Sequence, residues 1–197
     1  MCIRDSNKVL RSVKLATKNL RGATTLDQIR GIEGSVAAAW WKYFATLVPE
    51  PWTFTHRRSH PSTDPVNALL SLGYMMLMVR AQTLLSVAKL DTHVGFLHAM
   101  RPGRPSLACD LIEPYRVSVV DKMVVAMLSR KQLSSKDFVV GRKRSCELTR
   151  EALKSVIAAF ENQFGDCNGE VHSSMTADIR RWCKAVSYTH LTLPTKA

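Results

Sequence analysis

The sequence lacks the cysteine spacing of a zinc or redox site. It has five cysteines in 197 residues, and no two of them form a CxxC pair. Neither a structural zinc site nor a thioredoxin-like motif is therefore indicated. Without such a motif, we expect reduced thiols and a location in the cytoplasm.

Long apolar runs and acidic residues are also scarce. No uninterrupted apolar run approaches the ~20 residues needed to span a bilayer, so we expect no membrane insertion. The chain has 16 acidic residues against 28 lysines and arginines, which gives a formal net charge of +12. This surplus favours a polyanionic partner, either nucleic acid or an anionic membrane. A basic surface that binds neither is the alternative.

The two ends of the chain resemble translated sequencing adapters. The peptides MCIRDS (residues 1–6) and VSYTHLTLPT (residues 186–195) are what a transposon-end adapter encodes when it is read from each side. We therefore interpret residues 1–6 and 186–197 as adapter-derived and exclude them from fold reasoning. Residues 7–185 are then expected to form one helical domain that belongs to a longer gene product.

Helical periodicity dominates residues 7–185. It predicts helices over residues 9–20, 26–48, 65–88, 106–130, 149–164 and 175–184, a short helix around 94–100, and a small β-hairpin within 138–148. The predicted fold class is all-α, a multi-helix bundle with at most one small β-hairpin. The helix over 65–88 is apolar nearly all round, so we expect it to be the central buried helix, with its methionines as core filler.

Local signals set the expected helix boundaries. Thr25 and Gln28 have the spacing of a capping box. Asp64 followed by Pro65 is a strong helix start, because Asp is favoured as N-cap and Pro at the first helical position. Pro114 removes the amide that would bond to the Asp110 carbonyl, which predicts a kink or a restart of that helix.

Glu33 is the first candidate for chemistry. It lies beside Gly34 and two residues after Gly31, in the middle of a predicted helix. Each glycine costs that helix about 1 kcal/mol relative to alanine, so a close approach of another backbone or a ligand is expected there. A carboxylate at this point is well placed to reach a metal or a phosphate. A solvent-facing glutamate on a tightly packed helix is the alternative.

His98, Asp110 and Glu113 form a second candidate group. His98 lies three residues after Gly95, in an apolar stretch. It is a candidate metal ligand, and the alternative is a core histidine whose hydrogen bonds are satisfied within the protein. Asp110 and Glu113 are three residues apart, so they share one face of a helix. Two half-buried carboxylates repel each other, and a divalent cation would offset that cost. A favourable helix dipole is the competing explanation.

These carboxylates and the histidine together favour a hard, mainly oxygen site for Mg²⁺ or Mn²⁺. Beside a basic surface, such a site suits phosphodiester chemistry. Four stretches of the sequence then resemble, in order, the CRISPR-associated integrase family, the first Cas protein of the spacer-acquisition complex. They are RGIEG (30–34), DPVNALLSLGY (64–74), GFLH (95–98) and SLACDLIEPYR (106–116).

The resemblance implies a helical catalytic domain and assigns roles to particular residues. Glu33, His98 and Glu113 would hold Mg²⁺ or Mn²⁺, with Asp110 close by as a fourth catalytic residue. A second set of residues would contact DNA: Arg57, Arg58 and Arg116. The family's β-rich N-terminal domain is missing from this chain, and residues 55–62 match the family's arginine and proline pattern only loosely.

The resemblance also implies an activity and partners. A 3′ hydroxyl of a spacer precursor would attack a backbone phosphate at the edge of a CRISPR repeat, and water would replace that hydroxyl on branched DNA. The full-length protein would form homodimers bridged by a small ferredoxin-like Cas partner. Two alternatives remain open. One is a non-catalytic basic helical module that binds nucleic acid, and the other is a helical scaffold that binds proteins.

Overall fold

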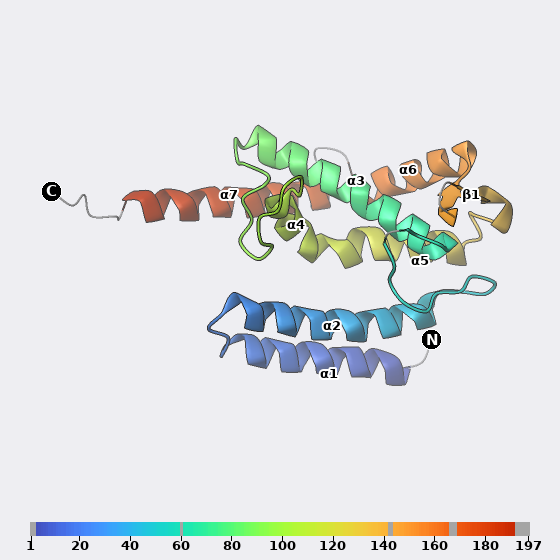
Figure 1. The fold of residues 1–197 in the computed structure, drawn as a ribbon, viewed down its shortest axis with the longest axis horizontal. Helices are drawn as coiled ribbons and strands as arrows, with labels where there is room; N and C mark the ends of the chain where they lie inside the picture. The colour runs from blue at the N-terminus through green and yellow to red at the C-terminus, as the bar shows by residue number, and fades with distance from the viewer. Residues whose placement is uncertain (1–2, 60, 142–143, 166–168, 192–197) are drawn as a thin grey trace. The chain divides into compact units, whose positions relative to one another are not determined.

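The computed structural model describes residues 3–59, 61–141, 144–165 and 169–191, and side chains for residues 7–185 within those ranges. Its helices, in chain order, are α1 (Ile3–Leu20), α2 (Leu26–Leu47), α3 (Pro65–Val87), α4 (Ser106–Ile112), α5 (Lys122–Ser129), α6 (Arg150–Phe164) and α7 (Glu170–Leu191) (Figure 1). Strands β1 (Phe138–Val140) and β2 (Cys146–Leu148) form one antiparallel hairpin. The predicted all-α class with one small hairpin is confirmed.

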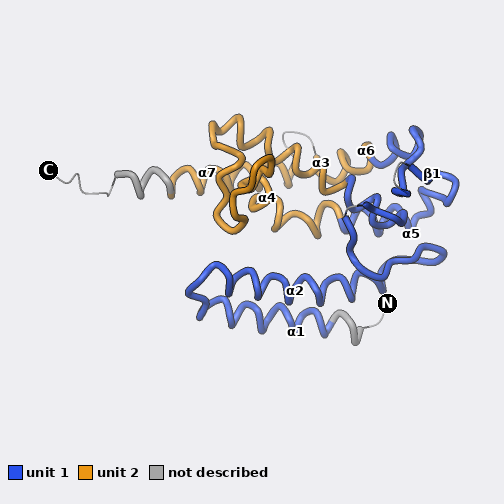
Figure 2. Tube along the Cα trace, viewed as in Figure 1, with its two compact units in different colours: residues 1–72, 121–156 blue, residues 73–120, 157–197 orange. Residues whose placement is uncertain are grey.

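The chain divides into two compact units (Figure 2). Unit 1 comprises residues 1–72 and 121–156, and unit 2 comprises residues 73–120 and 157–197. Each unit has its own buried apolar side chains. In unit 1 they include Phe44, Leu69, Leu70, Val124, Leu128 and Val156, and in unit 2 they include Leu77, Leu85, Leu111, Val119, Phe160 and Met175.

In unit 1, α1 and α2 form a helical hairpin (Figure 1). The turn begins after Leu20, where the Gly22 amide donates to the Asn19 carbonyl over 3.1 Å. The predicted capping box opens α2: the Gln28 amide donates to Thr25 Oγ1, and the Thr25 amide donates to Gln28 Oε1. Two orphan amides of the first turn are thus satisfied locally, so α2 begins where the sequence predicts.

The outer face of α1 is basic. Ala16 is 8% exposed and marks the face that packs on α2. Four exposed cations, which we call the α1 basic stripe, lie on the opposite face at helical spacing: Arg11, Lys14, Lys18 and Arg21. The helix is therefore amphipathic, with a basic outer face.

Aromatic side chains fix the second half of α2 in unit 1. Phe44 is fully buried, and its ring lies 5.0 Å from that of Phe54 and 5.4 Å from that of Trp41. One turn earlier, the Trp40 indole donates to the buried Asp121 carboxylate over 2.7 Å. Large apolar area and one satisfied buried charge therefore hold this half of the helix.

The start of α3 is fixed by Asn67, which is 2% exposed. Its amide group donates to the Asp64 carboxylate and the His56 carbonyl. Its Oδ1 accepts from the Arg58 backbone amide at 2.8 Å and from the Arg57 guanidinium at 3.0 Å. Asp64 also accepts from the Asn67 backbone amide, as predicted for an N-cap. The basic loop before α3 is therefore tied to the first turn of the helix.

The burial of α3 is less complete than predicted. Leu69, Leu77 and Leu85 are fully buried, but Met75 is 59% exposed and Val79 55%. These two residues are four apart and lie on one outer face, so Met75 does not fill the core. By length and apolar composition alone α3 could cross a membrane, although polar residues such as Arg80 interrupt its apolar run as expected. Of its apolar 18-residue window, 44% is buried inside the protein.

The structure differs from two of the predicted helices and confirms a predicted helix break. Residues 94–100 form no helix, because the amides of residues 96–98 bond to the carboxylate of Asp110. The last helix begins at Glu170 and not at residue 175, with that acidic side chain in its first turn. The predicted break at Pro114 is confirmed: α4 ends at Ile112, and a 3-10 turn and a π-helix precede α5. Arg142 of the hairpin loop and the end segments 1–2 and 192–197 lie outside the described residues.

We expect Asn67→Ala to destabilise the protein by about 2–3 kcal/mol, because it leaves buried donors and acceptors unsatisfied. Urea unfolding followed by circular dichroism measures this. Asn162→Ala, on the exposed side of α6, is the control and should change stability by less than about 0.5 kcal/mol. Equal unfolding midpoints for the two variants would contradict the structural role of Asn67.

Candidate functional site

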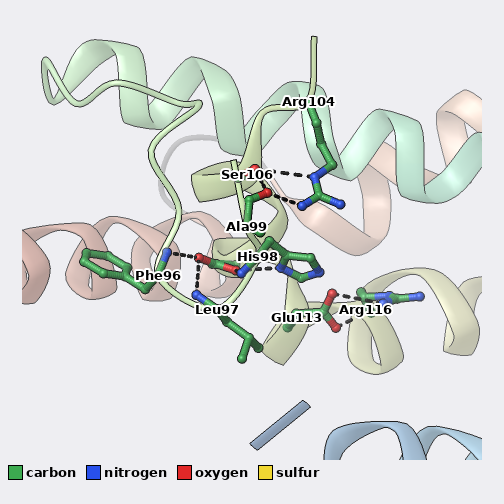
Figure 3. Close-up of polar contacts among 9 residues, drawn as sticks. Phe96, Leu97, His98, Ala99, Arg104, Ser106, Glu113 and Arg116 are labelled. Atoms are coloured by element: carbon green, nitrogen blue, oxygen red, sulfur yellow. Dashed lines mark hydrogen bonds and ion pairs between the residues drawn. The ribbon is translucent and has the colours of Figure 1, made fainter. Parts of the chain in front are cut away.

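The candidate site in unit 2 is built around the Asp110 carboxylate on α4. Its side chain is 7% exposed and accepts four hydrogen bonds (Figure 3). The backbone amides of Phe96, Leu97 and His98 donate to it over 2.5, 3.0 and 3.0 Å, and the His98 ring donates over 2.6 Å. The charge is therefore compensated, as a buried carboxylate requires. The loop at residues 96–98 is wrapped around this one side chain.

The Asp110 contact fixes the orientation of His98. A carboxylate only accepts hydrogen bonds, so His98 Nδ1 carries the proton that lies between the two groups. In the neutral ring, the lone pair is then on Nε2. A carboxylate behind one ring nitrogen is the usual arrangement of a histidine that ligates a metal through the other. The structure thus brings His98 and Asp110 together, with Asp110 as the orienting group.

The loop that carries His98 leaves no room for a larger residue at Gly95. A Cβ there would lie 2.8 Å from the His98 carbonyl oxygen, 2.8 Å from Ser106 Cβ and 2.9 Å from Asp110 Oδ2. The end of the loop is held by α4, because Ser106 Oγ donates to the Ala99 carbonyl over 3.0 Å. Arg104 donates to the same carbonyl (Figure 3).

Glu113 lies one turn after Asp110 and has a different environment. Both residues have helical backbone conformation, so they share a face of the chain. The Glu113 carboxylate accepts two hydrogen bonds of 3.0 Å from Arg116 Nη1, and the pair is only partly buried. The Arg116 guanidinium also lies 4.6 Å from the centre of the Tyr74 ring. Burial lowers the pKa of Arg116, but Glu113 and Tyr74 raise it, and the net change is upward.

Tyr115 connects the turn after Glu113 to α7. Its hydroxyl donates to Asp178 Oδ2 over 2.6 Å. Burial, and next the hydrogen bond to Asp178, raise the pKa of Tyr115 well above its usual value. The hydroxyl therefore stays protonated and keeps its role as donor. Neither Tyr74 nor Tyr115 was singled out from the sequence, although both lie inside the two long motif stretches at 64–74 and 106–116.

Glu33 lies in unit 1, on the exposed first half of α2. It is seven residues before Trp40 and eleven before Phe44, so it lies on the same side of α2 as these two aromatic residues, but it is itself exposed. The neighbouring glycines are not explained by packing, because a Cβ on Gly31 or Gly34 would meet nothing within 4 Å. The expectation that another part of this chain's backbone approaches them is therefore wrong for the described residues.

An open hollow of about 630 Å³ lies beside this part of α2. The α1–α2 turn and the first half of α2 line it, with Lys18, Gly31, Ile32 and Ser35 among the lining residues. Access to the Gly31 backbone is therefore open from this side.

The candidate metal ligands divide between the two units. Glu33 belongs to unit 1, and His98, Asp110 and Glu113 belong to unit 2. Within the described part of the chain, no three His, Cys, Asp or Glu side chains form a group that could hold a metal ion. Of the residues expected to contact DNA, Arg58 is exposed, whereas Arg57 is tied to Asn67 and Ser71, and Arg116 to Glu113.

The fold and these side chains define a helical domain with a histidine oriented by a carboxylate, a glutamate paired with an arginine, and a first helix with a basic outer face. The chain belongs to the family described as CRISPR associated protein Cas1, whose family model matches residues 4–162. It is 37% identical over 140 residues to a CRISPR-associated endonuclease Cas1 of Thermus thermophilus, an alignment that covers 71% of this chain and 42% of the relative. The family inferred from the four sequence motifs is therefore confirmed.

Solved structures have the same fold. A casposase bound to integration product has a TM-score of 0.81 at 27% identity and covers 92% of this chain and 57% of that chain. A chain of a Cas6-RT-Cas1–Cas2 complex has a TM-score of 0.84 at 24% identity and covers 92% of this chain and 20% of that chain. The present chain spans less than half the length of the curated relatives that it matches.

We expect Gly95→Ala to destabilise the protein by about 1–3 kcal/mol, because the new methyl group must displace the His98 carbonyl, Ser106 or Asp110. Hydrogen exchange at the amides of residues 96–98 should become faster at the same time. Thermal unfolding and exchange monitored by NMR would test both effects.

Gly31→Ala is the matched control, because its Cβ has open space within a helix. It should stabilise the protein by up to about 1 kcal/mol. If Gly95→Ala were as stable as Gly31→Ala, the close packing of the loop around Asp110 would be refuted.

Proposed function

We propose that this chain carries the metal-dependent catalytic site of a DNA strand-cutting and strand-joining enzyme that inserts short DNA fragments as spacers into a CRISPR array. The observation that carries the proposal is the His98–Asp110 pair, in which a buried carboxylate orients the ring and leaves Nε2 for a metal. The relatives named as endonucleases and the casposase bound to integration product support the same class of reaction.

The donor set fits a hard divalent cation. We infer that Glu33, His98 and Glu113 hold Mg²⁺ or Mn²⁺, which accept two carboxylates and one imidazole. When bound, such an ion neutralises charge on a phosphodiester and activates the attacking oxygen. The glycines beside Glu33 support its inclusion, since they leave the α2 surface open at that point.

The chain's own residues have separate tasks in this proposal. Asp110 holds the proton on His98 Nδ1 and keeps the ring in one orientation. Arg116 neutralises Glu113 while it is unliganded, and its guanidinium then becomes available to a phosphate oxygen when Glu113 changes partner. Arg57 shapes the loop before α3, so that Arg58 is left on the exposed side for the DNA backbone.

The proposed substrates are a spacer precursor and the edge of a CRISPR repeat. A 3′ hydroxyl, or water on branched DNA, attacks the phosphate in line. The opposite P–O ester bond breaks, and its oxygen leaves as the hydroxyl of the released strand end, which takes up the proton that the nucleophile loses. We propose that the full-length protein acts as a homodimer with a small ferredoxin-like Cas partner, in the cytoplasm. The solved complex that contains both Cas1 and Cas2 supports such a partner. The α1 basic stripe adds affinity that does not depend on DNA sequence.

Replacing Glu33 tests the catalytic proposal. In the full-length protein, Glu33→Gln should lower strand transfer at least about 100-fold, because it removes a charged ligand, and leave DNA affinity nearly unchanged. A gel assay of branched-DNA cleavage and fluorescence anisotropy measure the two quantities. The exposed loop variant Glu50→Gln is the control. Full activity of Glu33→Gln would exclude this residue from the site and favour a module that only binds nucleic acid.

The α1 basic stripe should set part of the salt dependence of DNA binding. Replacing its four residues together by Gln should reduce the slope of log K against log [salt] by up to ~0.9 for each cation that contacts a phosphate. Binding titrations between low and moderate salt measure the slope.

The control variant loses the same four positive charges from another part of unit 1. Four exposed residues there are changed to Gln: Arg130, Lys136, Arg150 and Lys154. In this control variant, the slope of log K against log [salt] should fall less than in the variant of the α1 basic stripe. If the two variants had equal slopes, only net charge would matter and the stripe would not be a DNA contact. If the unmodified protein had no salt-dependent affinity, a protein-binding scaffold would be the better description.

A further inference from the structure

Helix α7 follows the part of the chain that the Cas1 family model matches. The match ends at residue 162, and α7 begins at Glu170. Within unit 2, one face of α7 is built in: Met175 is fully buried and Ile179 is 3% exposed. Asp178 and Trp182 lie on this same face, because Asp178 is three residues after Met175 and Trp182 is three residues after Ile179. The helix therefore has an inner face with two polar or aromatic side chains that the proposed reaction does not use.

Trp182 contacts the loop that surrounds Asp110. Its ring centre lies 5.7 Å from that of Phe96 at 75°, an edge-to-face contact. Phe96 is 58% exposed with this contact in place, and its backbone amide makes the shortest of the three backbone bonds to Asp110. Trp182 therefore contacts the side chain of Phe96, the residue whose backbone amide helps to define the path of the loop. His98 follows two residues later.

Asp178 contacts the other part of the candidate site. It accepts the hydrogen bond from Tyr115, which lies two residues after Glu113 in the 3-10 turn. Pro114 interrupts the helix at this turn, so its position is not set by a continuous helical hydrogen-bond ladder. A charged acceptor at 2.6 Å supplies a strong tertiary restraint in its place. One helix is therefore attached to the loop before His98 and to the turn after Glu113.

We propose that α7 is a brace that positions His98 and Glu113, with Trp182 and Asp178 as positioning residues. This inference rests on the metal-binding role proposed above. The two contacts restrain segments 96–98 and 113–115 against the same rigid helix. Neither positioning residue touches the reacting groups, and both act through Phe96 and Tyr115.

The test uses the 197-residue chain and two variants, Trp182→Leu and the conservative Tyr115→Phe. Hydrogen exchange at the amides of residues 96–98 should accelerate about two- to tenfold in Trp182→Leu, the factor that corresponds to an aromatic pair. In Tyr115→Phe, exchange in the turn at residues 113–118 should accelerate by about tenfold or more. Arg180→Ala, an exposed change on the opposite face of α7, is the control and should leave both segments unchanged.

A second measurement separates positioning from general stability. Mn²⁺ affinity, followed by electron paramagnetic resonance, should fall about tenfold or more in both variants, as for loss of a group that orients a ligand. Exchange in α1 and α2 of unit 1 should stay as in the unmodified chain.

Each result decides a separate point. Unchanged exchange at 96–98 and in the 113–118 turn, with α7 still helical by circular dichroism, would overturn the brace. Equal acceleration throughout the chain would also overturn it, because the two residues would then serve stability alone. If the unmodified chain bound no Mn²⁺, the metal-binding proposal would fail, and the exchange data would still decide whether α7 positions the two segments.

Discussion

The structure of the candidate site depends on how the Asp110 charge is compensated. A buried carboxylate costs several kcal/mol unless hydrogen bonds replace its hydration. Three backbone amides and the His98 ring do so here. Because the amides belong to consecutive residues, their bonds determine the path of the loop as well as the charge balance. The tight fit at Gly95 and the orientation of His98 follow from the same interaction.

The same interaction shows what the sequence could and could not predict. Helix boundaries at Thr25, Asp64 and Pro114 depend on neighbouring residues, so local signals placed them correctly. Residues 94–100 have apolar spacing that favours a helix, but Asp110 takes their amides from outside the segment. A pattern of neighbouring residues cannot predict this contact, because Asp110 lies outside the segment. His98 and Asp110 were selected as candidates from the sequence, whereas their division of labour required the hydrogen-bond geometry.

Two arginines that were expected to contact DNA form hydrogen bonds within the protein, which the sequence does not show. The family resemblance led us to expect that Arg57, in the loop before the 64–74 motif, and Arg116, in the 106–116 motif, contact DNA. In the structure, Arg57 binds Asn67 and Ser71, and Arg116 binds Glu113. An arginine has five donors, so internal bonds that shape a site and contacts with a phosphate can coexist on one side chain. The surface of α1 is different, because its cations lie on an exposed face opposite the packing face.

Asp110 and Glu113 are one helical turn apart, yet their partners give them different chemistry. Asp110 is bound mainly by backbone amides, which cannot leave without moving the loop, so it is suited to orient a neighbour. Glu113 is bound by a side chain, the guanidinium of Arg116, in a partly exposed pair. Such a pair can exchange its cation at modest cost, because solvent and a second cation can compensate both charges. Under the metal-binding role proposed above, this difference favours Glu113 as the group that changes partner and Asp110 as the group that keeps His98 in place, although both are acids on the same face of the chain.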